Sequence, residues 1–466
     1  MLLGLLSIPF ALSREEEKAQ LSSGDEKLVV LSSHWEGARY EFGQAFRRHC
    51  AQTLGRSVTV EWLDVGGTAD TVKFIGSEFA RNPATIGVDV VFGGGVEAHM
   101  QLAKRGYLAP VSLTDELRRE IPEMLSGMRI YDARRRWFGA ALSGFGILYN
   151  IPVLRRLGLP TPQKWEDLAK PEMLTWVGSG DPRSSGSTHM VYEIILQAYG
   201  WKKGFSVVLR MGANIRSFSR SSADVPRDTS LGEVACGMAL DSYAWNQMER
   251  VGRHRLGYVL PPRLTVINPD AVAMLKGAPH RQLAEEFIHF VLSRKGQALW
   301  MLPPKKKLSV PKSSAPDSQH ETLEGPRRFA LTRMSVRRDL HRLLKGNSPV
   351  EMDPFSWEGS FPYDDKKASK RWDIINALLG AAILDNHHRL QTAWRRLIQS
   401  GTPRDLLRRL TKPPMTEREL MNMAQRWSED AAYRSRMRVR WAKLFRARYG
   451  KIASSLARPS RWGCSR

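Results

Sequence analysis

The feature that most constrains the fold of this chain is a regular alternation of strand and helix patterns that begins at Lys27. Short apolar runs with the length of buried strands occur at 28–31, 58–63 and 88–92. Amphipathic stretches with the period of a helix follow them at 38–54, 72–80 and 98–105. Because parallel neighbours need a crossover, this order predicts an α/β fold with a mainly parallel sheet covered by helices on both faces.

The loops after these strands carry polar or small residues. Ligands of such sheets bind beyond the carboxyl ends of the strands, where the loops 32–36, 66–68 and 93–95 are expected. The candidate binding residues in these loops are Ser33, His34, Trp35, Gly94 and Gly95. His34 either contacts a ligand or caps a helix. Trp35 either stacks on a ring or sugar face or packs between helices.

A serine-rich turn at 181–188 is the strongest local sign of a binding site. An apolar run at 173–177 predicts a strand before it, and a helical pattern starting at Met190 follows. The first N–H groups of a helix lack intrahelical partners and attract negative charge. One cap needs a single hydroxyl, so the cluster predicts an anion site formed by Ser184, Ser185, Gly186, Ser187 and Thr188. Arg183 either pairs with the anion or ties the turn to Asp181.

The turn and five other blocks resemble the type 2 periplasmic solute-binding proteins of ABC importers, in the branch that includes ferric-iron, thiamine, phosphonate and sugar-phosphate binders. The other blocks, in chain order, are 28–36, 89–95, 144–150, 232–244 and 269–280. The resemblance covers about residues 26–305. It implies a two-lobe periplasmic-binding-protein type 2 fold with a hinge, with 26–140 and 262–304 in lobe 1 and 141–261 in lobe 2.

The resemblance also implies a function. The chain would be an exported, periplasmic receptor that closes on a small, anionic solute and delivers it to ABC permease subunits in the inner membrane. It would be a monomer without a cofactor, would bind no nucleic acid and would not be an enzyme. The second-lobe positions that match the family's ligand-binding segment are Asp241 and Tyr243.

Ferric-iron binding is the alternative within this family. The iron-binding members have a histidine at the loop of His34 and two adjacent tyrosines at the position of Tyr243, but Ala244 replaces the second tyrosine here. A carboxylate after the third strand is replaced by a glycine turn, with Glu97 displaced beyond it. The resemblance therefore leaves only His34 and Tyr243 for Fe(III). The segment around Asp241 instead fits relatives that bind organic solutes, and the alternative for Tyr243 is a half-buried residue with a structural role.

The two ends of the chain differ in composition from this region. Residues 1–25 are expected to be a signal peptide or an N-terminal tail, because the apolar run 1–12 is too short to span a bilayer and precedes small residues. Residues 305–330, rich in Pro, Ser and Lys, predict a linker. Residues 331–466 predict a basic helical extension, with helical periods at 372–384, 390–398, 417–427 and 433–445.

Charge and motifs define the competing functions. Of the net charge of +24, roughly +19 lies in residues 305–466. A nucleic-acid-binding or membrane-binding protein acting through the basic C-terminal helices is therefore a second hypothesis. An enzyme is a third, although the sequence contains no phosphate-binding GxxxxGK[ST], no GxSxG and no HExxH motif. The cysteines Cys50, Cys236 and Cys464 have no metal-binding spacing, and the first two are expected to be buried.

Overall fold

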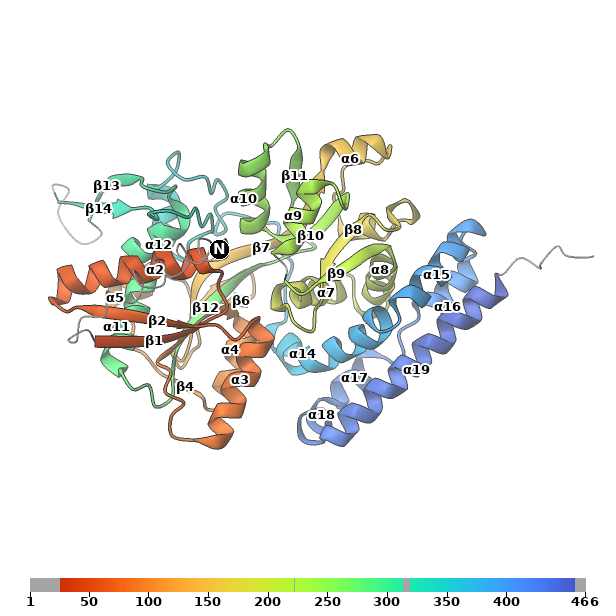
Figure 1. Ribbon diagram of the computed structural model, residues 1–466, viewed down its shortest axis with the longest axis horizontal. Coiled ribbons are helices and arrows are strands. Elements are labelled where there is room, and N and C mark those ends of the chain that lie inside the picture. Colours follow the sequence, from red (N-terminus) through yellow and green to blue (C-terminus); the bar gives the residue numbers. More distant parts are fainter. Residues whose placement is uncertain (1–25, 222, 313–318, 457–466) are drawn as a thin grey trace, which may run out of the picture.

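The computed structural model describes residues 26–221, 223–312 and 319–456, so the expected signal peptide or tail at 1–25 lies outside the described residues. A ten-stranded mixed sheet runs through the molecule in the order β2-β1-β3-β12-β7-β10-β8-β9, and helices cover both faces (Figure 1). The predicted α/β class is confirmed. Two short strands, β4 (Leu108–Ala109) and β11 (Leu256–Val259), pair with β12 and β7 beside this path.

Lobe 1 is the half of the sheet that contains the predicted alternation. Strand β1 (Glu26–Ser32) pairs in parallel with β2 (Val58–Leu63) and β3 (Val90–Gly95), and β12 (Ile267–Leu275) joins β3 antiparallel. Its helices are α2 (Glu36–His49) with the π-turn η1 (Cys50–Leu54), α3 (Thr68–Arg81), α4 (Val96–Lys104), α5 (Asp115–Glu120), α11 (Arg281–Leu292) and α12 (Arg294–Met301). A small hairpin of β5 (Met124–Leu125) and β6 (Met128–Arg129) lies beside them.

Strand β7 (Phe138–Asn150) joins the two lobes. Its first half pairs with β12, and its second half pairs with β10 (Cys236–Leu240) and β11. The remaining strands of lobe 2 are β8 (Val177–Gly180) and β9 (Ile215–Ser219). Its helices are α6 (Ile151–Arg156), α7 (Gly186–Ala198), α8 (Trp201–Asn214), α9 (Asp224–Leu231) and α10 (Asp241–Val251), with 3-10 turns η2 (Trp165–Ala169) and η3 (Pro171–Met173).

The strand before the serine-rich turn begins later than the sequence predicts. Residues 171–173 form η3, because Pro171 occupies its first helical position and fixes the backbone there. Strand β8 therefore starts at Val177, the last residue of the predicted apolar run.

The expected linker at 305–330 is corrected by the structure. Strands β13 (Lys307–Pro311) and β14 (His320–Glu324) form an antiparallel hairpin whose Val310 and Leu323 are buried in the core of lobe 1. The buried Glu41 of α2 accepts the backbone N–H groups of residues 327, 328 and 329 at 2.5, 2.6 and 2.8 Å. Each strand contributes only one buried apolar side chain, which is why the composition resembles that of a linker.

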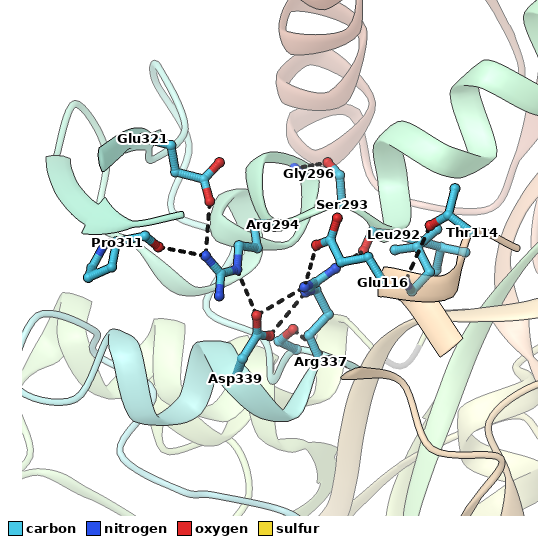
Figure 2. A network of polar contacts seen from close by, with 12 residues as sticks. Thr114, Glu116, Leu292, Ser293, Arg294, Gly296, Pro311, Glu321, Arg337 and Asp339 are labelled. Atoms are coloured by element: carbon cyan, nitrogen blue, oxygen red, sulfur yellow. Dashed lines mark hydrogen bonds and ion pairs between the residues drawn. The ribbon is translucent and has the colours of Figure 1, made fainter. Parts of the chain in front are cut away.

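The next segment also belongs to lobe 1. The Leu142 N–H donates to the Met334 carbonyl at 2.8 Å, and α13 (Arg338–Leu343) packs on α12. Figure 2 shows Asp339 between the side chains of Arg294 and Arg337. These ion pairs measure 2.7 and 2.9 Å, and Arg337 is fully buried.

The C-terminal helices pack on lobe 2 (Figure 1). They are α14 (Asp365–Leu379) with the π-turn η4 (Gly380–Leu384), α15 (His387–Gln399), α16 (Arg404–Thr411), α17 (Glu417–Asn422), α18 (Ala424–Glu429) and α19 (Ala431–Ser455). The helical periods at 372–384, 390–398 and 433–445 are confirmed, whereas the one at 417–427 is divided into α17 and α18 at Met423. Helix α19 buries side chains three or four positions apart, and these are Met437, Trp441, Phe445, Tyr449 and Ile452.

A buried ion pair ties the extension to lobe 2. The Arg371 guanidinium of α14 and the Glu193 carboxylate of α7 are both fully buried and lie 2.7 Å apart, and Arg371 also pairs with Glu417 at 2.5 Å. The helices after residue 365 thus share one hydrophobic core with lobe 2.

Two further sequence expectations concern thiols and membrane spans. Cys50 and Cys236 are buried free thiols, as predicted, and Cys464 lies outside the described residues. Across 26–221, 223–312 and 319–456, every helix is too short or too polar to cross a bilayer.

Candidate functional site

A cleft of about 710 Å³ lies between the lobes. The loops 32–36, 66–68 and 93–95 approach it from lobe 1, at the carboxyl ends of β1, β2 and β3, and the serine-rich turn approaches it from lobe 2. Of the sequence-predicted residues, it is lined by Ser33, His34, Trp35, Gly94, Gly95, Ser184, Ser185, Gly186, Ser187 and Tyr243. The structure brings these residues together, and their contact with a ligand stays a prediction.

Two predicted site residues do not line the cleft. Asp241 is fully buried, and its carboxylate accepts the N–H groups of Gly144 and Ser242, each at 2.6 Å. It therefore fastens the start of α10 to β7, and burial raises its pKa to about 7. The Thr188 hydroxyl points back to the Ser185 oxygen at 3.1 Å. Ser242, beside Asp241, lines the cleft instead.

The N-terminus of α7 opens on the cleft. Ser185 is the N-cap, and its hydroxyl oxygen accepts the Thr188 N–H at 3.3 Å. The Ser184 hydroxyl donates to the carbonyls of Asp181 and Arg220, so part of the hydroxyl cluster holds the turn together. The Gly186 N–H has no partner among the residues that the structure describes. Since the helix dipole places positive potential here, this end of α7 favours an anion.

The two lobes touch across the mouth of the cleft. A Cβ atom at Gly67 would lie 2.5 Å from the Ser184 carbonyl oxygen, and one at Gly186 would lie 3.3 Å from the Cβ of Thr68. Gly67 and Thr68 belong to lobe 1, whereas Ser184 and Gly186 belong to lobe 2. The two lobes are therefore in direct contact beside the cleft.

Arg333 is a cleft residue that the sequence analysis missed. Its side chain is 8% exposed, pairs with Asp270 at 2.5 Å and donates to the Ser143 hydroxyl at 2.6 Å. Its guanidinium lies 5.3 Å from the centre of the Trp300 ring, and its Nε has no hydrogen-bond partner within the described part of the chain. Arg333 lies beyond the region of family resemblance. The available signal was an apolar run, Phe329 to Val336, inside a basic segment.

Other missed residues come from both lobes and from the C-terminal helices. Trp372 of α14 lines the cleft and packs on His189 with ring centres 3.6 Å apart. Asn268 of β12 and the exposed Arg220 also line it. Trp372 had been predicted only as part of a helical period, because nothing in its local sequence indicates which lobe that helix packs against.

His34 and Trp35 are fixed by aromatic neighbours. His34 lies edge-on to Phe92 with ring centres 4.6 Å apart, and burial lowers its pKa to about 4. It is therefore neutral at pH 7, and its Nε2 has no partner among the described residues. The Trp35 ring covers Gly37 and packs edge-on against Phe329, but 40% of the residue stays exposed. Its exposed face keeps the stacking interpretation open.

Most carboxylates at the cleft are paired with cations. Asp181 pairs with Arg183 at 2.7 Å, and Arg183 also binds Asp385. Of the two interpretations of Arg183, the structure therefore shows the one in which it ties the turn to Asp181. Burial raises the Asp270 pKa, but the charge and hydrogen bond of Arg333, together with the nearby His34 and His99, lower it overall. Burial raises the Glu97 pKa to about 7. Arg220 has no ion pair among the described residues, so the cleft retains an unneutralised cation.

The described residues contain no group of three or more His, Cys, Asp or Glu side chains placed to hold a metal ion. His34 and Tyr243 line the same cleft, but the Glu97 carboxylate oxygens accept hydrogen bonds from another side chain. The Asn268 amide donates to both of them at 3.2 and 3.3 Å.

Comparisons with known proteins agree with this geometry. Residues 86–323 match a family model described as bacterial extracellular solute-binding protein. The phosphoglycerate transport regulatory protein PgtC of Salmonella typhimurium is 32% identical over 159 residues, which is 34% of this chain. The match spans 39% of the length of that relative.

Two solved structures share the fold. The periplasmic binding protein AfuA from Actinobacillus pleuropneumoniae, with exogenous fructose-6-phosphate bound, matches with a TM-score of 0.52 and 23% identity over 59% of this chain and 82% of its own. The apo ferric ion-binding protein A of Pasteurella haemolytica matches with a TM-score of 0.56 and 16% identity over 76% of this chain and 96% of its own. The predicted two-lobe fold is confirmed.

Proposed function

Because this chain belongs to the family of bacterial extracellular solute-binding proteins, we propose that it is the exported receptor of an ABC importer. It closes its lobes on a small anionic solute in the periplasm, as a monomer, and delivers the solute to permease subunits in the inner membrane. No step of this function needs catalysis or a cofactor.

One observation carries the anionic character of the ligand. The N-terminus of α7 and the Arg333 guanidinium line the same cleft from different parts of the chain. Each has an unused hydrogen-bond donor, because the Gly186 N–H and the Arg333 Nε have no partner within the described residues. Hydrogen bonds from a charged or dipole-supported donor to an anion are shorter and stronger than neutral ones. An oxyanion between these two groups would satisfy both.

The ligand that fits best is a phosphate monoester of a small hydroxy acid or sugar. A phosphate offers the several acceptor oxygens that the α7 N-terminus and Arg333 require. Trp35 and Trp372 offer aromatic faces for the carbon skeleton. The relative named for phosphoglycerate transport and the neighbour with bound fructose-6-phosphate support this class.

Calorimetric titration tests the proposal. The purified protein is titrated with 3-phosphoglycerate, fructose 6-phosphate, a phosphonate, citrate and ferric citrate. Arg333→Lys keeps the charge but loses the planar fork, so we expect at least about tenfold weaker binding of the preferred anion. Arg338→Lys, an exposed neighbour of the same chemistry, is the matched control. Absence of binding by every phosphate and carboxylate would remove the anionic ligand.

A further inference from the structure

A second cavity, of about 880 Å³, opens on lobe 1 and shares no lining residue with the cleft. It lies between the end of α2, helix α12 and the β13–β14 hairpin. Its apolar lining consists of Ala45, Phe290 and Leu299, all of them buried. The cavity was not anticipated, because the hairpin that forms one wall was expected to be a linker.

Cationic side chains surround this cavity. They are Arg48, Lys295, Lys305, Lys306, Lys307, Lys312 and Arg327. The two carboxylates of the lining are already engaged, since Glu321 pairs with Arg294 at 3.0 Å and Glu324 pairs with Lys307 at 2.6 Å. Within the described ranges, no ion pair neutralises the side chains of Arg48, Lys295, Lys305, Lys306 or Arg327. The cavity is therefore strongly electropositive.

Arg48 is the residue of the cationic lining whose side chain has a buried nitrogen without a partner among the described residues. It is half-buried, and this nitrogen is Nη1. Burial lowers its pKa, and the neighbouring Arg327 charge lowers it further. His49, the next residue, is held by Glu286 at 2.7 Å and does not compete for a ligand. A half-buried guanidinium with one buried, unpartnered nitrogen beside another cation favours a negative partner.

Backbone hydrogen bonds hold two lysines of the cavity lining, Lys305 and Lys306, in place. Lys305 has a φ of 65°, in the left-handed region, and its N–H donates to the Pro326 carbonyl at 2.7 Å. The Gly325 N–H donates in turn to the Lys306 carbonyl at 2.8 Å. An ordered turn with an uncommon backbone conformation thus presents neighbouring ammonium groups to one cavity.

We propose that this cavity binds a group carrying two or more phosphate charges. Arg48 would bind one phosphate, and Lys305, Lys306 and Arg327 would bind a second. Several unpaired cations exceed what a singly charged ligand neutralises, whereas a diphosphate or a cluster of anionic headgroups matches them. The site is separate from the solute cleft and does not depend on the proposed transport function.

Titration of the full chain with inorganic pyrophosphate at low and at physiological salt tests this proposal. We expect binding that weakens as salt rises, because opposite charges are screened. Lys305→Gln with Lys306→Gln should weaken it at least about fivefold, and adding Arg48→Gln at least about fiftyfold. Lys443→Gln with Lys451→Gln removes the same charge from exposed positions of α19 and should have no effect.

A parallel arm identifies the source of the phosphate. Vesicles of phosphatidylglycerol are sedimented with the protein, with phosphatidylcholine vesicles as the comparison. If the protein sediments with phosphatidylglycerol vesicles and the Lys305 and Lys306 substitutions abolish this, the site is assigned to membrane headgroups. If the protein binds pyrophosphate but does not sediment with the vesicles, the site is assigned to a free polyphosphate. If pyrophosphate does not bind, or if Arg333→Lys weakens its binding while the Lys305 and Lys306 substitutions do not, the proposal is overturned.

Discussion

Gly67→Ala should block closure of the lobes while leaving the fold intact. The backbone at Gly67 has φ −74° and ψ 174°, which any residue adopts, so alanine does not strain the chain there. In the present arrangement of the lobes, however, the new Cβ atom would lie 2.5 Å from the Ser184 carbonyl oxygen of the other lobe. The substitution therefore penalises only the arrangement in which the lobes touch.

The size of this penalty follows from the contact. An ordinary contact begins at 3.4 Å, so the facing backbones would have to separate by roughly an ångström. Overpacking of this kind costs about 1–3 kcal/mol. If ligand binding requires closure, the same free energy is lost from binding, and the affinity falls about 5- to 150-fold. Gly67 also caps α3, but a weaker cap acts equally on open and closed lobes.

The assay compares affinity with stability. Calorimetry measures the binding of the preferred anion, small-angle X-ray scattering measures compaction on adding it, and thermal unfolding without ligand measures the fold. Gly450→Ala, where a Cβ atom meets nothing within 4 Å, is the control and should leave binding unchanged. Unchanged affinity and compaction in Gly67→Ala would refute the closure argument.

Four further results are expected. Burial raises the Glu97 pKa from 4.5 to about 7. Between these values the folded chain holds a proton that the unfolded chain has lost, so stability falls as pH rises from about 4.5 to 7. Glu97→Gln should flatten this pH dependence of the melting temperature and stabilise the protein by about 1–3 kcal/mol at pH 8. Arg371→Met leaves the fully buried Glu193 unpaired and should cost about 3–5 kcal/mol in urea unfolding, with partial recovery in the double variant Arg371→Met/Glu193→Leu. The protein should stay colourless with ferric citrate, since Ala244 follows Tyr243; a visible absorption band that Tyr243→Phe abolishes would contradict this. A chain ending at residue 310 should be insoluble, because it lacks the buried Leu323, Met334 and Ile375, and a soluble, ligand-binding fragment of that length would show that the later segments are dispensable.

Local patterns were sufficient to predict the first three strands of lobe 1 and the helices that follow them. The run at 58–63 matches β2 residue for residue, because β-branched residues in a short apolar segment leave few alternatives. The serine-rich turn was also predicted as a helix start, and Ser185 is the N-cap. Strands of this kind and helix starts depend on residues close together in the chain, and the sequence is therefore sufficient to predict them.

Features that depend on distant partners were not predicted. Arg333 belongs to a basic segment, and only the packing of that segment on Trp300 and β7 turns it into a cleft residue. The hairpin at 307–324 was missed because its strands bury one apolar side chain each. Asp241 was placed in the site, yet it holds two backbone N–H groups, and a sequence does not reveal which way a short carboxylate points.

Residues 351–364 connect the two lobes on the side of the loop that leads into β12. This segment crosses beside the loop that leads into β12, where the Arg263 N–H donates to the Gly359 carbonyl at 2.6 Å and the Phe361 N–H to the Thr265 carbonyl at 3.2 Å. It leads to Tyr363, whose hydroxyl contacts Glu97 of lobe 1 at 3.5 Å and Met190 of lobe 2 at 3.3 Å.

Helix α14, which follows, contacts both α4 and α7. Separating the lobes therefore means peeling α14 from one of them and exposing apolar surface to water, at a free-energy cost proportional to the area exposed. This cost raises the barrier to solute entry and exit together. On the proposed function, solute should therefore enter slowly, stay bound for long residence times and be released only when a partner opens the lobes.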